Sequence, residues 1–151
     1  MLMSQDKITT RDARNSDIDA MALLMTELGY PTAAPAMAAR FEAIKQEPGY
    51  KTILAVLNEE VVGMAGCTVN NFFEQDGKYV RIAAFVVSNR YHQKGIGRVL
   101  ITAAEEWATN VNAHTVLLNC GHKEERTAAH VFYKKMGYQV KSSGYYKKIL
   151  L

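Results

Sequence analysis

The sequence predicts an α/β fold of the α+β type, in which one mixed, mostly antiparallel and twisted sheet carries helices on both faces. Segments with strand or helix periodicity follow one another in the order βααβββαβαββ. The length of 151 residues, with 48% hydrophobic and 22% charged residues, is typical of one globular domain. The chain has no internal repeat, linker or low-complexity tract, so we expect a single domain over residues 1–151.

Residues 15–30 predict an amphipathic helix. Asn15 or Ser16 can cap its N-terminus, and Gly29 can end it. Apolar side chains recur on one face at helical spacing: Ile18, Met21, Leu24, Met25 and Leu28. The other elements are predicted in the same way: strands at 7–14, 51–58, 61–73, 78–87 and 114–120, helices at 36–46, 97–110 and 123–137, and a hairpin at 138–150 that turns at 142–144.

The charge and the cysteines limit the classes of protein. A net charge of +3 is too weakly basic to indicate a nucleic-acid partner, but it suits an anionic ligand held locally. Cys67 and Cys120 form neither a CxxC motif nor a disulfide framework, which is typical of a reducing compartment. The N-terminal MLMSQDKITT lacks a signal-peptide core, and no apolar run reaches membrane-spanning length. We therefore expect a cytoplasmic protein with no membrane partner.

The stretch HQKGIGR, residues 92–98, lies between a predicted strand and a predicted helix. Gly95 and Gly97 let backbone N–H groups converge, while Lys94, Arg98 and the helix N-terminus add positive charge, a combination that suits a phosphate or pyrophosphate. A Walker loop is excluded because its first glycine is missing, and a dinucleotide fingerprint lacks its third small residue because Leu100 stands there. A tight strand-to-helix turn without a ligand stays open.

The stretch FVVSNRYHQKGIGRVL, with AHVFYKKMGY some thirty residues later, resembles the GCN5-related N-acetyltransferase (GNAT) family. The resemblance covers residues 8–150, and the segment 124–150 is most similar to the small-molecule branch that contains aminoalkylphosphonate N-acetyltransferases. It implies a GNAT-like domain whose sheet is splayed at two central parallel strands, 81–87 and 115–119. Acetyl-CoA is then the co-substrate, and a primary amine of a small molecule attacks its thioester directly.

The resemblance also implies roles for particular residues. Gly95 and Gly97 match the family motif Gln/Arg-x-x-Gly-x-Gly/Ala, whereas His92 departs from its first position. Tyr133 would act as general acid toward the CoA sulfur, although a core aromatic beside Phe132 is the alternative. The implied acetyl-CoA-binding residues are Phe85, Val86, Val87, His92, Gln93, Lys94, Gly95, Ile96, Gly97 and Arg98.

The general base is not identified by the resemblance, because Ala84 stands where many members carry Glu. Glu74, Asp76, His122 or water could replace it. The expected acceptor-lining residues are Tyr30, Phe73, His122 and Arg126. No residue spacing indicates a metal site, so we expect none. A homodimer stays open, as does a peptide or protein acceptor. The absence of an acid at Ala84 also leaves a non-catalytic acyl-CoA-binding module open, whereas the presence of Tyr133 favours an enzyme.

Overall fold

The computed structural model describes residues 7–92, 94–119, 127–141 and 144–149. The chain divides into two compact units, Met1–Leu117 and Leu118–Leu151. The first unit contains the sheet with three of the helices, and the second contains the last helix and the C-terminal segment. The prediction of one domain over residues 1–151 stays a prediction, since this division concerns compactness and not independent folding.

The sheet has five strands in the order β1-β2-β3-β4-β5, so each strand lies beside the next one in the sequence. The bounds are Ile8–Asp12 for β1, Tyr50–Leu57 for β2, Glu60–Asn71 for β3, Lys78–Val87 for β4 and Ala113–Leu118 for β5. The first four strands pair antiparallel, and β4 and β5 are parallel. The predicted mixed, mostly antiparallel sheet is therefore confirmed.

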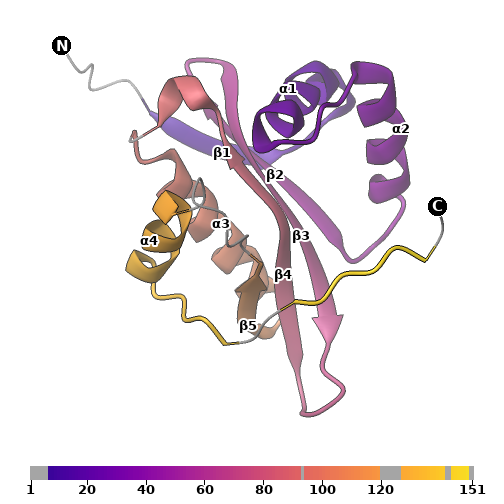
Figure 1. Cartoon of the computed structure of the whole chain (residues 1–151), viewed down its shortest axis with the longest axis vertical. Coiled ribbons are helices and arrows are strands. Elements are labelled where there is room, and N and C mark those ends of the chain that lie inside the picture. The colour runs from indigo at the N-terminus through magenta and orange to yellow at the C-terminus, as the bar shows by residue number, and fades with distance from the viewer. Residues whose placement is uncertain (1–6, 93, 120–126, 142–143, 150–151) are drawn as a thin grey trace. The chain divides into compact units, whose positions relative to one another are not determined.

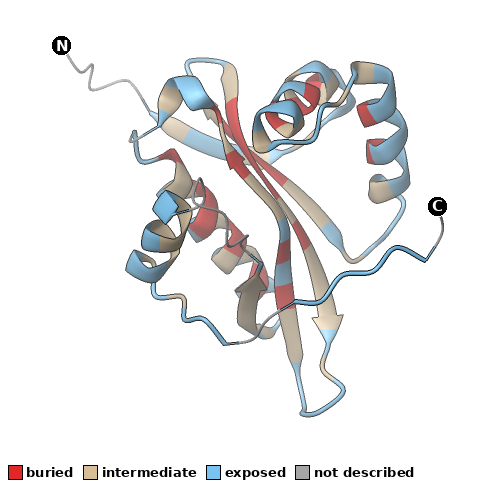
Figure 2. Cartoon of the chain, in the orientation of Figure 1, coloured by how far each residue is buried: buried red, intermediate tan, exposed pale blue. Residues whose placement is uncertain are grey.

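Helices lie on both faces of this sheet, as Figure 1 shows for α1 (Ile18–Leu28) and α2 (Ala34–Lys45) on one side and α3 (Ile96–Asn110) on the other. The register places Leu54, Met64 and Val86 side by side on three neighbouring strands. Their side chains join a buried cluster with residues of α1 and α2, among them Met21 and Phe41. The buried positions accordingly run along the middle strands and the helix surfaces that turn toward them (Figure 2).

The residues next to these along each strand face the opposite side of the sheet, because side chains alternate along a strand. Gly63 pairs with Ala55 on β2 and Val87 on β4, and all three face α3. Leu100 and Ile101 of α3 are fully buried there. Small residues in the sheet thus allow α3 to pack close to it.

The start of the first helix differs from the prediction. Residues Asn15–Asp17 form a short 3-10 turn, η1, and α1 begins only at Ile18. Asp17 is buried and accepts two hydrogen bonds from the Arg11 guanidinium, at 2.8 and 2.9 Å, and one from the Arg14 N–H at 2.8 Å. These bonds favour the tight turn. The predicted end is confirmed, because Gly29 has φ +118° and closes α1 in the left-handed region.

The second unit contains α4, Thr127–Lys135, and the predicted helix is confirmed over these residues, whereas 123–126 lie outside the described part. Gly137, with φ +94°, ends the helix. The predicted hairpin is wrong for residues 138–141 and 144–149, which form no strand; 142 and 143 lie outside the described residues. The alternation that suggested strands buries no apolar face there, since Val140, Tyr145, Tyr146 and Ile149 are all exposed.

Candidate functional site

The chain leaves the sheet at the end of β4 through a short, hydrogen-bonded path. Ser88 is buried, and its N–H donates to Val62 O at 2.8 Å. A 3-10 turn, η2, covers Asn89–Tyr91, with the Tyr91 N–H bonded to Ser88 O at 3.0 Å. His92 Nε2 lies 3.3 Å from Val87 O and donates to it, because a carbonyl only accepts. The structure thus brings His92 back to the end of β4.

Gly95 forms the turn into α3. Its φ of +84° lies in the left-handed region, where a side chain is strained. Its carbonyl accepts the Val99 N–H at 3.2 Å, so Gly95 is the N-cap of α3. A Cβ built on Gly95 would meet no atom within 4 Å, so this side of the turn is open.

The first turn of α3 carries backbone N–H donors that the helix itself does not use. The N–H groups of Ile96, Gly97 and Arg98 precede the first intrahelical bond of α3. No acceptor for them is found among the described residues. Such donors, together with the positive end of the helix dipole, bind phosphate oxygens well.

Two cations flank these donors. The Lys94 and Arg98 side chains are exposed, and neither forms an ion pair with a described residue. Charges that are not neutralised within the chain remain available for an anionic ligand. The donors of Ile96–Arg98 and the two exposed cations therefore fit the pyrophosphate of CoA in their chemistry.

Two carboxylates hold the segment just before this turn. The Asn89 N–H donates to Glu27 Oε1 at 2.7 Å, and the Tyr91 hydroxyl donates to Glu60 Oε1 at 2.7 Å. Arg90 forms an ion pair with Glu60. The bond to Glu60 raises the pKa of Tyr91, so the phenol stays a neutral donor at ordinary pH. No local sequence pattern marks either acid, because Glu27 and Glu60 lie far from the loop along the chain.

The strand β4 is irregular beside its predicted functional end. Gly66 pairs with Ala84 and Cys67 with Ile82, which leaves Ala83 as the extra residue of a β-bulge. Bulges re-aim the side chains that follow them and are frequent next to active sites. Val86 points into the core with Met64, so Phe85 and Val87 point to the other face. Any role of Val86 toward acetyl-CoA would thus use its backbone.

The acidic substitutes for a general base in the described part of the chain lie far from Ala84. Glu74 and Asp76 are exposed in the connection between β3 and β4. From Lys78 to Ala84 the strand rises by about 20 Å at roughly 3.4 Å per residue. The structure therefore does not bring these two carboxylates to the position that Ala84 occupies.

The remaining predicted residues are scattered. Tyr30 follows α1 and is 63% exposed, and Phe73 lies fully exposed in the β3–β4 connection, which points away from α1 and α2 in Figure 1. The structure does not bring these two together. Gln93, His122 and Arg126 lie outside the described residues.

Tyr133 lies on α4, in the second unit. Its ring is half-buried and makes edge contacts with Phe132, at 5.4 Å between centroids, and with Tyr138, at 6.2 Å. Within this unit Tyr133 therefore belongs to an aromatic cluster, and its role as general acid stays a prediction.

Cys67 does not provide a nucleophile. It is buried on β3, and this burial raises the pKa of its thiol to about 12. Because the thiolate is the reactive form, Cys67 is inert near neutral pH. No group of three or more His, Cys, Asp or Glu able to hold a metal is found in the part of the chain that the structure describes. Within the same residues, no helix has the length and apolar character needed to cross a bilayer.

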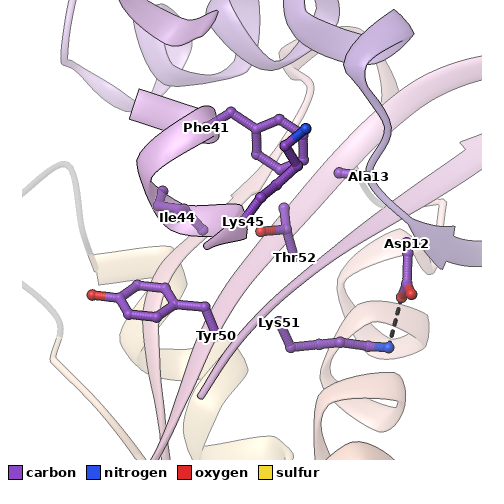
Figure 3. Close-up of a pocket in the computed structure, with 8 residues that line it drawn as sticks. All are labelled: Asp12, Ala13, Phe41, Ile44, Lys45, Tyr50, Lys51 and Thr52. Carbon is purple, nitrogen blue, oxygen red and sulfur yellow. Dashed lines mark ion pairs between the residues drawn. The ribbon is translucent and has the colours of Figure 1, made fainter. Parts of the chain in front are cut away.

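A separate pocket of about 180 Å³ lies between α2 and the strands β1 and β2 (Figure 3). Its charged groups are already paired: Lys51 Nζ lies 2.7 Å from Asp12 Oδ1, and Lys45 bonds to Asn15 and lies over the Phe41 ring. The sheet order places β3 between this pocket and β4. This pocket is therefore distinct from the loop that follows β4.

Comparison with known proteins agrees with this geometry. Residues 18–138 match the Acetyltransferase (GNAT) family. The chain is 26% identical over 142 residues to the uncharacterized N-acetyltransferase YhdJ of Bacillus subtilis (strain 168), covering 93% of this chain and 95% of that protein. A GNAT family acetyltransferase of Staphylococcus aureus superposes with a TM-score of 0.81 at 29% identity, over 94% of this chain and 98% of that one.

A more distant structure shares the fold. The aminoglycoside N-acetyltransferase AAC(6')-Iy, solved in complex with CoA, superposes with a TM-score of 0.82 at 18% identity, over 99% of this chain and 100% of that one. A family match over residues 18–138 establishes the class. The chain belongs to the GNAT family and is an acetyl-CoA-dependent acyltransferase.

Proposed function

We propose that this chain transfers the acetyl group of acetyl-CoA to a primary amine of a small molecule, which attacks the thioester directly. The open left-handed turn at Gly95 is the observation that carries the proposal. It leads into the first-turn N–H groups of Ile96–Arg98, for which the described residues provide no acceptor. It provides donors and positive charge where a pyrophosphate can bind. Lys94 and Arg98 act by charge and hold the CoA end of the substrate.

The chemistry requires few side chains. The neutral amine attacks the carbonyl carbon, a C–N bond forms, the C–S bond breaks, the nitrogen loses a proton and the sulfur gains one. A backbone N–H at Phe85–Val87 would stabilise the developing oxyanion. Tyr133 would protonate the departing sulfur, since a phenol with an unperturbed pKa of about 10 stays protonated at neutral pH.

Of the predicted substitutes for a base at Ala84, Glu74 and Asp76 lie beyond the far end of β4, and His122 lies outside the described residues. We therefore assign the removal of the amine proton to water, so that the enzyme binds the acceptor as the free amine. This assignment predicts that activity rises with pH as the acceptor amine deprotonates. The inert thiol of Cys67 supports direct attack over an acyl-enzyme on that residue.

The acceptor class rests on resemblance. The segment 124–150 is similar to aminoalkylphosphonate N-acetyltransferases, and the structural neighbour AAC(6')-Iy is named for aminoglycosides. Aminoalkylphosphonates and aminoglycosides are both small-molecule amines. We propose that Tyr30, His122 and Arg126 contribute to acceptor binding, and that aminoalkylphosphonates are the first acceptors to test. Phe73 is left out of this proposal because it lies apart from Tyr30, in the β3–β4 connection.

The experiment combines CoA binding with thiol release from acetyl-CoA. Wild-type protein should bind CoA with a Kd of about 1 μM, or roughly 8 kcal/mol. Gly97→Val places a branched side chain in the first turn of α3, where backbone must approach the phosphate, and should abolish binding while the protein stays folded. Thr102→Val, an exposed position of the same helix, is the matched control and should bind normally.

The panel of acceptors contains an aminoalkylphosphonate, an aminoglycoside and a lysine-containing peptide. Thiol release with a small amine supports the proposal. Release with the peptide alone would replace it by a peptide acetyltransferase, and unchanged CoA affinity in a folded Gly97→Val protein would contradict the assignment of the loop.

A further inference from the structure

Both ends of the η2 turn are held by carboxylates from elements distant in sequence. Glu27, near the end of α1, accepts the Asn89 N–H at 2.7 Å. Glu60, at the start of β3, accepts the Tyr91 hydroxyl at 2.7 Å and pairs with Arg90. Three consecutive residues of the loop are therefore bonded to two acids.

Apolar packing does not replace these contacts. A pocket of about 220 Å³ lies between α1, the start of β3 and η2. Its lining includes Leu23, Leu24 and Val61 as well as Glu27, Glu60 and Arg90. Because this space is hollow, the described residues leave η2 without close packing on the side that faces α1. The position of the turn depends on its polar contacts instead.

The next residues along the chain form the proposed cofactor site. His92 bonds back to Val87, and Gly95 and the N-terminus of α3 follow. A displacement of η2 would therefore move the segment that presents Lys94 and Gly95 to the phosphates. Phosphate binding by backbone N–H groups requires a fixed arrangement of the donors.

We infer that Glu27 and Glu60 are positioning residues for acetyl-CoA: they hold residues 89–91 so that the turn at Gly95 faces the pyrophosphate. The inference rests on the proposed cofactor site. Neither acid touches the substrate, and both act through the loop. Glu27 and Glu60 lie far apart in the sequence, and the structure places both in the lining of the pocket beside η2.

Electrostatics alone predicts that removing Glu27 or Glu60 strengthens CoA binding, which is the opposite of what the positioning role predicts. CoA is a polyanion, so loss of a nearby carboxylate, and release of Arg90 from its ion pair, should strengthen binding. Loss of positioning should weaken binding despite the more positive charge. The direction of the change therefore separates the two explanations.

The first test uses Glu60. Glu60→Ala should weaken CoA binding about fivefold by calorimetry, the scale of one exposed ion pair with one hydrogen bond. Tyr91→Phe keeps the ring and removes one contact, so it should fall between wild type and Glu60→Ala. Glu59→Gln is the matched control, because it removes the same charge from the neighbouring residue. The Glu59 side chain is exposed and makes no hydrogen bond or ion pair with a described residue. The Glu59→Gln protein should bind as tightly as wild type or slightly more tightly.

The second test uses Glu27. Glu27→Ala removes the acceptor of the Asn89 N–H and should weaken CoA binding roughly threefold. Glu27→Gln keeps an oxygen that can accept this N–H, so it should restore binding to within about twofold of wild type. The amide rescue would not occur if the charge alone mattered. With an acceptor amine, both Ala variants should raise the KM for acetyl-CoA and leave kcat nearly unchanged.

Tighter or unchanged CoA binding in Glu60→Ala, with wild-type protein that binds CoA, would overturn the inference and leave the cofactor site intact. Equal loss in Glu27→Ala and Glu27→Gln would overturn the positioning role of Glu27. Wild-type protein that binds no CoA would instead refute the cofactor site, and the inference with it.

Discussion

Gly63 of β3 lies directly beneath Leu100 of α3: a Cβ built on Gly63 would sit 2.8 Å from Leu100 Cδ1. The same atom would lie 3.1 Å from Val86 O and 3.2 Å from Ile96 Cγ2. Ile96 is the first residue of α3 and a member of the proposed phosphate site. The absence of a side chain at Gly63 thus sets how closely the functional end of this helix approaches the sheet.

Gly63→Ala should therefore destabilise the protein by about 1–3 kcal/mol, the typical cost of overpacking a core. Because α3 must shift at its N-terminus, CoA binding should weaken as well. Thermal or urea unfolding measures the first effect, and calorimetry the second. Gly66→Ala on the same strand is the control, since its Cβ would meet only Ala84 Cβ at 3.7 Å, an ordinary contact. Equal stability of the two variants would contradict this account.

At Gly95 the effect of backbone conformation can be tested without steric overlap, because a side chain there would have space. Gly95→Ala forces alanine into φ +84° and should cost about 1–2 kcal/mol, and it should weaken CoA binding by disturbing the turn. Gly95→Asn should be milder on both measures, since asparagine tolerates the left-handed region. Gly29→Ala is the matched control: it also has positive φ and open space, so it should lose stability but bind CoA normally. Reduced CoA affinity in this control would show that the Gly95 effect is only global.

The sequence predicted most of the first unit, and the reasons are local. Strands 7–14, 51–58, 61–73 and 78–87 correspond to β1–β4 because each alternates or is apolar against a buried sheet. Gly95 and Gly97 predicted a helix that begins at residue 97, and α3 begins one residue earlier, at Ile96. The C-terminal hairpin failed because alternation predicts a strand only where one face is buried, and the described residues there are exposed.

The site was predicted only where its residues are adjacent in sequence. The loop 92–98 carries its own glycines and cations, so its chemistry is visible in one stretch. Glu27 reaches Asn89 across 62 residues, and Glu60 reaches Tyr91 across 31, and no local pattern encodes such contacts. The converse holds for the acidic candidates Glu74 and Asp76: they are near Ala84 in sequence, but the extended strand β4 places them away from it.

The charges of the loop should act on binding and not on the chemical step. Arg98→Ala and Lys94→Ala should each raise the KM for acetyl-CoA several-fold and leave kcat almost unchanged, because the pyrophosphate is held equally in the ground and transition states. The effect should shrink at high salt, since both side chains are exposed. Lys7→Ala, an exposed lysine before β1, removes the same charge elsewhere and should change neither constant. A large fall in kcat at unchanged KM would contradict the assignment.

Asp17 should make the free energy of unfolding depend on pH in the acidic range. The hydrogen bonds from Arg11, and secondarily the one from the Arg14 N–H, hold the pKa of this carboxyl below its ordinary value. A lowered folded-state pKa means that the stabilisation is complete above the unfolded pKa and is lost as pH falls through the folded pKa. Asp17→Asn should cost about 1–3 kcal/mol at pH 7 and should flatten the decline in stability below about pH 4. Urea unfolding across pH 2–7 measures both; parallel curves for the two proteins would contradict the role of the ion pair.

Tyr133 provides the test of the proposed general acid. Protonation of the CoA sulfur matters while the C–S bond breaks and little in the bound ground state, so removing the hydroxyl should lower kcat and spare CoA binding. Tyr133→Phe keeps the ring contacts with Phe132 and Tyr138, and its fold should survive. Loss of a positioned acid typically lowers the rate about 10²–10⁴-fold. The defect should shrink for thioesters with more acidic thiols, because their thiolates need less protonation to leave. Tyr138→Phe removes a neighbouring hydroxyl from the same aromatic cluster and should retain activity with every thioester. If Tyr133→Phe matches wild type across the thioester series, Tyr133 serves only to pack this cluster, and the sulfur takes its proton from water.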